Sequence, residues 1–147
     1  MLRAWPTRVG GNGEPLDAIR QVLDTRADVR LAYVFGSTVR GEARASSDVD
    51  VAVLFEPEPG PRDLDSLTTD LQVAARHAVD LVVLNTAPPL LTHQIIKTGR
   101  RVVCRAESER VRFETRAAAR YLDTAHLRRV QHRYLRERAD AFRARRS

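Results

Sequence analysis

Two aspartates stand inside a valine-rich, strand-like run, in the segment DVDVAVLF that begins at Asp48. Successive strand side chains point to opposite faces, so Asp48 and Asp50 share one face, about 6.6 Å apart along the chain, while Val51 and Val53 face a core. Two adjacent carboxylates repel each other and lose hydration unless a cation or hydrogen-bond donors compensate. Carboxylate oxygens suit Mg²⁺, whose coordination is usually completed by substrate phosphates. The pair therefore points to a magnesium-bound nucleotide.

A Gly-Ser turn precedes this pair. Gly36 and Ser37 end an apolar run and open a turn in which free backbone N–H groups and a hydroxyl can bind phosphate oxygens, and Arg40 adds a cation. The sequence contains neither a Walker loop nor a G-x-G-x-x-G fingerprint. Asp80 is a third acid, at the start of DLVVL, and on an adjacent strand it would reach the face of the aspartate pair. Three carboxylates are enough for two metal ions.

The hydrophobic pattern predicts the elements that position these residues. Helices are expected over GNGEPLDAIRQVLD, LDSLTTDLQVAARHA and PPLLTHQIIKTG, the last ending at Gly99. Strands are expected over LAYVF, DVDVAVLF, VDLVVLN and RRVVCR, with a short turn or helix after the first and an exposed loop at EPEPGPRD. This order indicates an α/β or α+β domain with helices packed on one small sheet, and leaves the strand order open.

The C-terminal part of the chain differs from the rest in composition. From Glu107 to Ala144 no Gly or Pro interrupts it, which predicts one long helix or two consecutive helices. Residues 105–147 hold 13 basic and 6 acidic residues, so this tail carries the whole excess of the net charge of +6. A solvated helix face and a docking surface both explain it, and sparse aromatics argue against nucleic acid. The candidate packing positions are Val111, Ala117, Ala118, Tyr121, Leu122, Val130 and Tyr134.

Length and composition exclude several other classes of protein. A chain of 147 residues fits one domain, and its 43% hydrophobic and 30% charged residues are typical of a soluble globular protein. No apolar run approaches the roughly 20 residues that span a membrane, and the N-terminus lacks a secretory signal, so we expect a cytoplasmic protein. Cys104 is the only cysteine, which excludes an internal disulfide, and the four histidines show no zinc-ligand spacing.

One segment resembles a known family. GSTVRGEARASSDVD has the pattern G-S, ten residues, D-x-D of the DNA polymerase β-like nucleotidyltransferases, and the R-G after G-S together with SDVDVAV is most similar to their minimal nucleotidyltransferase (MNT) branch. The resemblance is specific over Leu31–Phe55 and extends through Cys104, because VDLVVLN occupies the position of the family's third acid. It implies a small mixed sheet of the polymerase β palm type in residues 1–104, with residues 105–147 as an Arg-rich helical extension of the same domain.

The resemblance also implies an activity and a partner. RYLDTAHLRRVQHRYLRERA is similar to the tails of MNT antitoxins that are paired with HEPN toxins. In such pairs the MNT protein transfers AMP from ATP to a tyrosine hydroxyl of the HEPN ribonuclease and silences it, and the C-terminal helices would form the docking surface. The implied site residues are Gly36, Ser37 and Arg40 for the nucleotide, and Asp48, Asp50 and Asp80 for two Mg²⁺ ions and for catalysis.

Two other functions remain open from the sequence. One is a transferase that adenylates a small hydroxyl compound such as an aminoglycoside, although a tail with a net charge of +7 would repel a polycation. The other is an antitoxin that neutralises its toxin by binding alone. A neighbouring gene for a small helical protein with an R-x4-6-H motif would favour the toxin pair, whereas neighbouring resistance genes would favour the small-molecule transferase.

Overall fold

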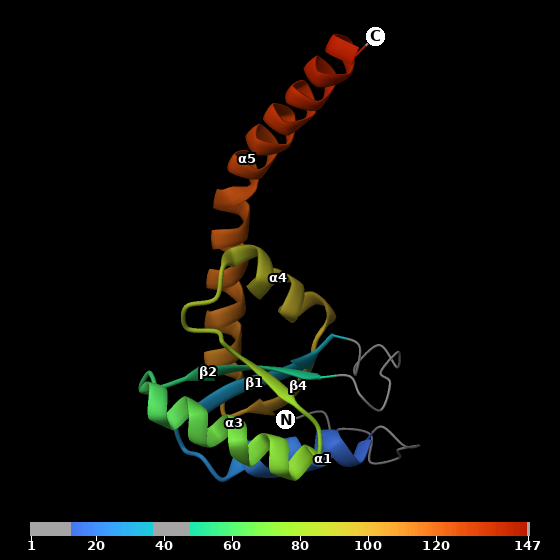
Figure 1. The fold of residues 1–147 in the computed structure, drawn as a ribbon. Helices are drawn as coiled ribbons and strands as arrows, with labels where there is room; N and C mark the ends of the chain where they lie inside the picture. The colour runs from blue at the N-terminus through green and yellow to red at the C-terminus, as the bar shows by residue number, and fades with distance from the viewer. Residues whose placement is uncertain (1–12, 37–47, 147) are drawn as a thin grey trace.

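A four-stranded sheet lies between helices in this computed structural model, which describes residues 13–36 and 48–146 (Figure 1). The predicted α+β fold is confirmed. The short turn or helix expected after the first strand lies outside the described residues. None of the helices in the described ranges has the length and apolar character needed to cross a membrane. The elements are α1 (Gly13–Asp24), β1 (Val29–Phe35), β2 (Val49–Phe55), α3 (Pro61–Ala75), β3 (Val79–Val83), α4 (Pro89–Thr98), β4 (Arg100–Cys104) and α5 (Glu107–Arg146).

The sheet is mixed, with the strand order β3-β2-β1-β4. The central strand β1 pairs antiparallel with β2 and with β4, whereas β2 pairs parallel with β3. The parallel pair needs a crossover connection, and α3 supplies it. Val49, Val51, Ala52 and Val53 on β2 are all buried, because helices cover both faces of the sheet.

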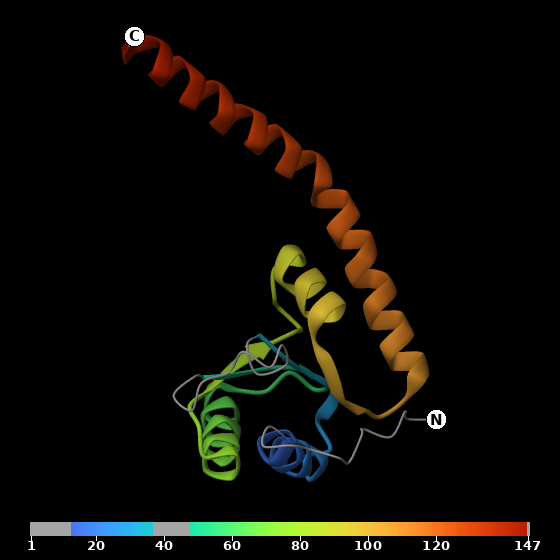
Figure 2. The same cartoon turned by 90° about the vertical axis from the view of Figure 1, so that its right-hand side faces the viewer.

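Helices α1 and α3 cover one face of the sheet (Figure 2). In α1, Leu16, Ile19 and Leu23 recur at helical spacing and are buried against the valines of β1 and β2. In α3, Leu67 and Leu71 are fully buried in the same cluster. Pro61 stands at the start of α3, where its missing N–H costs no hydrogen bond.

Helix α4 and the first turns of α5 cover the opposite face. Ile95 from α4 and Phe113 from α5 pack on Leu31, Tyr33 and Ala52 of the sheet. Helix α4 begins at Pro89 and ends before Gly99, as the sequence predicts. The second face is therefore shielded by a short helix and by the N-terminal part of a long one (Figures 1 and 2).

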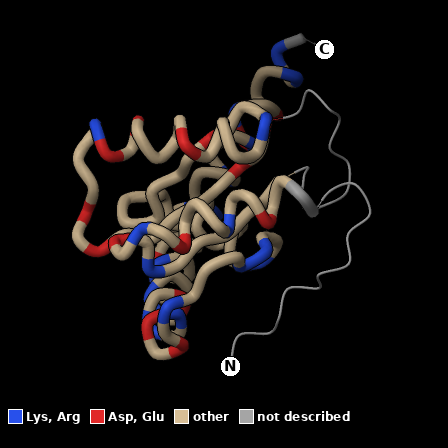
Figure 3. The backbone as a smooth tube through the Cα atoms, turned by 90° about the horizontal axis from the view of Figure 1, so that it is seen from below, with Lys and Arg blue, Asp and Glu red and all other residues tan. Residues whose placement is uncertain are grey.

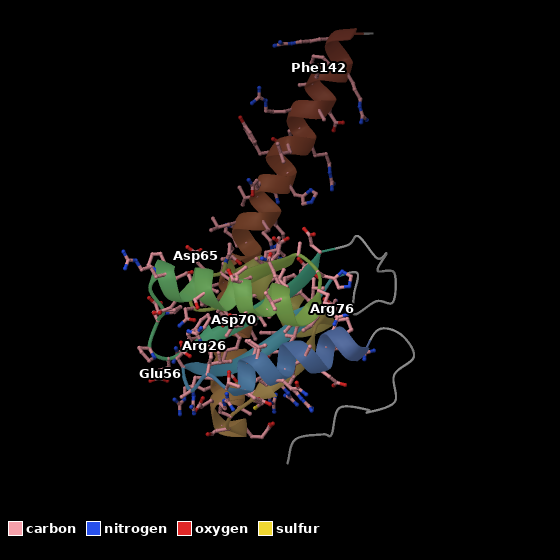
Figure 4. The ribbon with its side chains drawn as sticks, turned by 60° about the horizontal axis from the view of Figure 1, so that its bottom comes forward. Arg26, Glu56, Asp65, Asp70, Arg76 and Phe142 are labelled. Atoms are coloured by element: carbon pink, nitrogen blue, oxygen red, sulfur yellow. The ribbon has the colours of Figure 1, made fainter. Side chains whose placement is uncertain are left out.

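Residues 107–146 form a single helix of 40 residues, α5. Figure 4 shows Phe142 far along this helix, well away from the sheet, and Figure 3 shows basic residues near its C-terminal end. The packing positions predicted for this helix are only partly right: Ala117 is buried and Tyr121 is half-buried. The other five are exposed. Val111, Ala118 and Leu122 lie on turns of α5 that pack on the domain through other side chains, and Val130 and Tyr134 lie where α5 extends beyond the domain.

Candidate functional site

Three strand ends meet at one edge of the sheet. Because β1 runs antiparallel to β2 and β3, its C-terminal end lies beside the N-terminal ends of those two strands. In this register Asp50 pairs with Phe35 on β1 and with Asp80 on β3. Paired residues on neighbouring strands have Cα atoms about 5 Å apart, so the two aspartates are direct neighbours. Asp80 thus lies on the strand next to Asp50 and directly opposite it in the register.

The two aspartates share the face of the sheet that α4 and α5 cover. Phe35, the partner of Asp50 on β1, packs against the cluster on that face, and Ala52, two residues after Asp50, is buried in it. Asp50 is only half-buried and Asp80 is exposed, because both stand where the apolar cluster ends. Buried, Val-rich strands thus hold the two carboxylates at the boundary between core and solvent, where a charged substrate can reach them.

Gly36 directly adjoins the Asp50 carboxylate. Its φ of 81° lies in the left-handed region, which favours glycine. A Cβ on Gly36 would approach Asp50 Oδ2 more closely than the 3.0 Å below which such contacts essentially never fall, and would lie 3.4 Å from Asp50 Cγ. A side chain at position 36 would therefore displace the carboxylate, so the sequence provides both the turn and the space beside Asp50.

The other predicted site residues are Asp48, Ser37 and Arg40. Asp48 is exposed and precedes β2, while Ser37 and Arg40 lie outside the described residues. Within residues 13–36 and 48–146, no group of three or more His, Cys, Asp or Glu residues is arranged to hold a metal ion. The donors fit Mg²⁺ by type, because two carboxylates are paired in register and the glycine leaves room beside one of them.

Two polar contacts anchor α5 to the strand that leads into this site. The Tyr33 hydroxyl donates a hydrogen bond to Glu114 Oε1 at 2.7 Å, and Arg30 donates two to Glu109, at 2.9 and 2.5 Å. Burial, followed by the bond to Glu114, raises the pKa of Tyr33 well above its usual range, so its hydroxyl stays protonated as a donor. The bond from Arg30 lowers the pKa of Glu109. The base of α5 is thus tied to β1.

Comparisons with known proteins agree with this geometry. The family model described as "Polymerase beta, Nucleotidyltransferase" matches residues 17–108, a range that contains β1, β2, β3 and the aspartate pair. The chain belongs to this nucleotidyltransferase family. It is therefore a nucleotidyltransferase by descent.

Individual relatives place the chain among the minimal nucleotidyltransferases. It is 43% identical over 68 residues to the protein adenylyltransferase MntA of Thermococcus cleftensis, a match that covers 46% of this chain and 69% of the relative. A crystal structure of a toxin–antitoxin with AMP-PNP is similar with a TM-score of 0.73 and 25% identity, covering 82% of this chain and 97% of that chain. One chain in a structure of a tri-AMPylated Shewanella oneidensis HEPN toxin in complex with MNT antitoxin has the same fold, with a TM-score of 0.69 and 22% identity, covering 84% of this chain and 98% of that chain.

Sequence reasoning missed the anchoring contacts of this nucleotidyltransferase. Arg30 and Glu109, like Tyr33 and Glu114, are about 80 residues apart in the chain, and local spacing carries no signal for such a pairing. The only available clue was a polar tyrosine within the otherwise apolar run LAYVF. A buried tyrosine hydroxyl usually has a hydrogen-bond partner. The tyrosine in this run therefore predicts that a partner exists, but it does not say which residue the partner is.

Proposed function

We propose that this nucleotidyltransferase is an antitoxin that transfers AMP from ATP to a tyrosine hydroxyl of a cognate HEPN ribonuclease toxin, and thereby silences it. The observation that carries the proposal is the in-register pair of Asp50 and Asp80 beside the side-chain-free surface of Gly36. The name of the Thermococcus relative, a protein adenylyltransferase, and the nucleotide in the similar toxin–antitoxin crystal structure support it. The reaction would take place in the cytoplasm, where ATP and the toxin's RNA substrates are found.

Each site residue has a defined part in this reaction. Gly36 allows the triphosphate to approach the backbone, and Ser37 and Arg40 contribute a hydroxyl and a cation to its phosphates. Asp80 would accept the proton of the attacking tyrosine hydroxyl.

The aspartates also provide the ligands for magnesium. Asp48, Asp50 and Asp80 would hold Mg²⁺, which supplies charge neutralisation for the phosphates when bound. The oxygen of the tyrosine forms a new bond to the α-phosphorus, and the bond from that phosphorus to the bridging oxygen of pyrophosphate breaks.

The C-terminal helix would provide the docking surface for the toxin. Its base is fixed to β1 through Tyr33 and Arg30, so a toxin bound along α5 would be held at a defined position relative to the strand that leads into Gly36. Because the toxin is already bound, its tyrosine and the nucleotide would react within one complex and would not have to meet by diffusion. The high positive charge of the tail disfavours polycations such as aminoglycosides as acceptors.

Intact-mass spectrometry of the toxin tests the proposal. The protein encoded beside this chain is incubated with it, ATP and Mg²⁺, and its mass should rise by one or more AMP units. Asp50→Asn should abolish the increment. Asp70→Asn, an exposed acid on α3, is the matched control and should leave it unchanged. A stable complex without any mass increment would instead identify an antitoxin that acts by binding only.

A further inference from the structure

The distal half of α5 extends into solvent. Tyr121 ties the middle of α5 to the domain, because its ring stacks on His93 of α4 with 3.7 Å between ring centroids. Arg128 lies over Tyr121, 4.0 Å from its ring centroid. Every residue from Arg129 to Arg145 is exposed, a stretch about 25 Å long at 1.5 Å per residue. Figures 1, 2 and 4 show this part of the helix leaving the sheet and the other helices.

An apolar stripe runs along this exposed segment. Leu127, Val130 and Tyr134 follow one another at spacings of three and four residues, which places them on one side of a helix, and Leu135 flanks them. Their exposed fractions are 65%, 47%, 55% and 59%. The Tyr134 ring has Arg138 of the same helix beside it, with the guanidinium carbon 5.7 Å from the ring centroid. Large apolar side chains aligned in this way mark an interaction surface.

A row of arginines occupies a neighbouring side of the segment. Arg129, Arg133, Arg136 and Arg143 have spacings of four, three and seven residues, which again corresponds to one side of a helix. At about 100° per residue, Arg129 lies about 100° and Arg133 about 60° from Val130 around the helix axis, so the row adjoins the apolar stripe. Residues 129–145 contain six arginines and two acids, a net charge of +4 with histidine neutral. The segment is therefore amphipathic and strongly basic.

Charge decides between the possible partners of this surface. A second copy of α5 would bring two segments of net charge +4 together, which Coulomb repulsion opposes. A helix with one apolar side gains its stability from packing that side, which the domain does not provide here. We propose that residues 127–143 dock onto an acidic protein surface, with Leu127, Val130 and Tyr134 in an apolar groove and carboxylates of the partner facing the arginine row.

This inference rests on the proposed function, in which the partner is the cognate toxin, and it specifies the chemistry of the toxin's docking surface. The two sides of the helix have different tasks. Apolar side chains that become buried set the lifetime of the complex, whereas exposed arginines chiefly accelerate the encounter and make it sensitive to salt. The two sides can therefore be tested separately by kinetics.

The apolar side is tested by the double variant Leu127→Gln, Val130→Gln. Binding of the full-length protein to the immobilised cognate toxin is measured by surface plasmon resonance. The variant should dissociate at least tenfold faster, with little change in association rate. Leu122→Gln, which removes an exposed leucine from another side of the same helix, is the matched control and should bind as the wild type does. An unchanged dissociation rate in the double variant would overturn the inference.

The arginine side is tested by Arg129→Gln, Arg133→Gln, Arg136→Gln. This triple variant should associate at least tenfold more slowly at low salt and should lose most of the salt dependence of association. An association rate that equals the wild-type rate at every salt concentration would contradict an acidic partner surface. Circular dichroism at 222 nm confirms that each variant keeps its helix.

Two further measurements separate this inference from its rivals and from the proposed function. Sedimentation should find the isolated protein monomeric, and a dimer that the Leu127, Val130 variant abolishes would identify a second copy as the occupant. Tight retention of RNA by the arginine row would overturn the assignment to an acidic protein. The binding experiments need no ATP, so toxin that binds through the stripe without gaining AMP would refute the proposed activity while leaving the docking inference intact.

Discussion

Replacing Gly36 with alanine fills the space beside the Asp50 carboxylate and so tests whether that space is needed. The backbone φ of 81° is unfavourable for any residue with a Cβ, at a cost of about 1–2 kcal/mol. The added methyl group also overlaps Asp50 Oδ2, which must move to relieve the contact. A displacement of about 1 Å in a reacting group can cost about 100-fold in rate. We therefore expect Gly36→Ala to lower the free energy of unfolding by about 1–2 kcal/mol and the rate of AMP transfer about 100-fold.

Gly60→Ala provides the matched control for this substitution. Gly60 has an ordinary φ of −76°, and a Cβ there would meet Asp63 at a normal van der Waals distance of 3.9 Å. Stability is measured by urea denaturation, and activity by the initial rate of AMP incorporation into the cognate toxin at saturating ATP. An AMP-transfer rate for Gly36→Ala within about threefold of the Gly60→Ala rate would refute the role assigned to the space beside Asp50.

Three further outcomes are expected. Asp80→Asn should lower the rate of AMP transfer at least 100-fold without changing the thermal midpoint by more than a few degrees, and a transfer rate close to wild type would remove Asp80 from the site. Tyr33→Phe should cost about 1 kcal/mol in urea denaturation, because the buried hydroxyl loses its bond to Glu114, and an unchanged stability would show that this bond contributes nothing. Arg30 lowers the pKa of Glu109 below its ordinary value of 4.5, so their pairing stabilises the fold above that pH and ceases to do so as the pH falls through the lowered pKa. Arg30→Gln should therefore have a lower free energy of unfolding at pH 7 and should lose less of it on acidification. Parallel curves of stability against pH for variant and wild type would contradict this pairing.

Much of this fold follows from local patterns. Valine-rich runs bounded by polar residues predict the strands, and Leu16, Ile19 and Leu23 recur at the period of a helix, so α1 was predictable without tertiary information. The place of Asp80 in a valine-rich strand like that of Asp50 also indicated that the two acids could become neighbours. Their actual pairing depends on the parallel register of β2 and β3, which the crossover through α3 establishes.

Features that depend on distant parts of the chain were less accessible. Val130 and Tyr134 look like core residues by type and spacing, yet they are exposed, because α5 is longer than the sheet it packs against. A single sequence gives the apolar side of a helix but not the element that covers it. Likewise, the fit between Gly36 and Asp50 depends on how β1 and β2 pair, and the 13 residues between Gly36 and Asp50 in the chain do not encode that contact locally.

Transfer of label from ATP to the toxin tests the central claim most directly. The cognate toxin is incubated with this protein, Mg²⁺ and ATP labelled with ³²P at either the α- or the γ-phosphate, and is then separated under denaturing conditions. AMP transfer predicts that label from the α-phosphate stays on the toxin while label from the γ-phosphate appears only in pyrophosphate. Label from the γ-phosphate on the toxin, or no label from either position while a complex forms, would contradict the account.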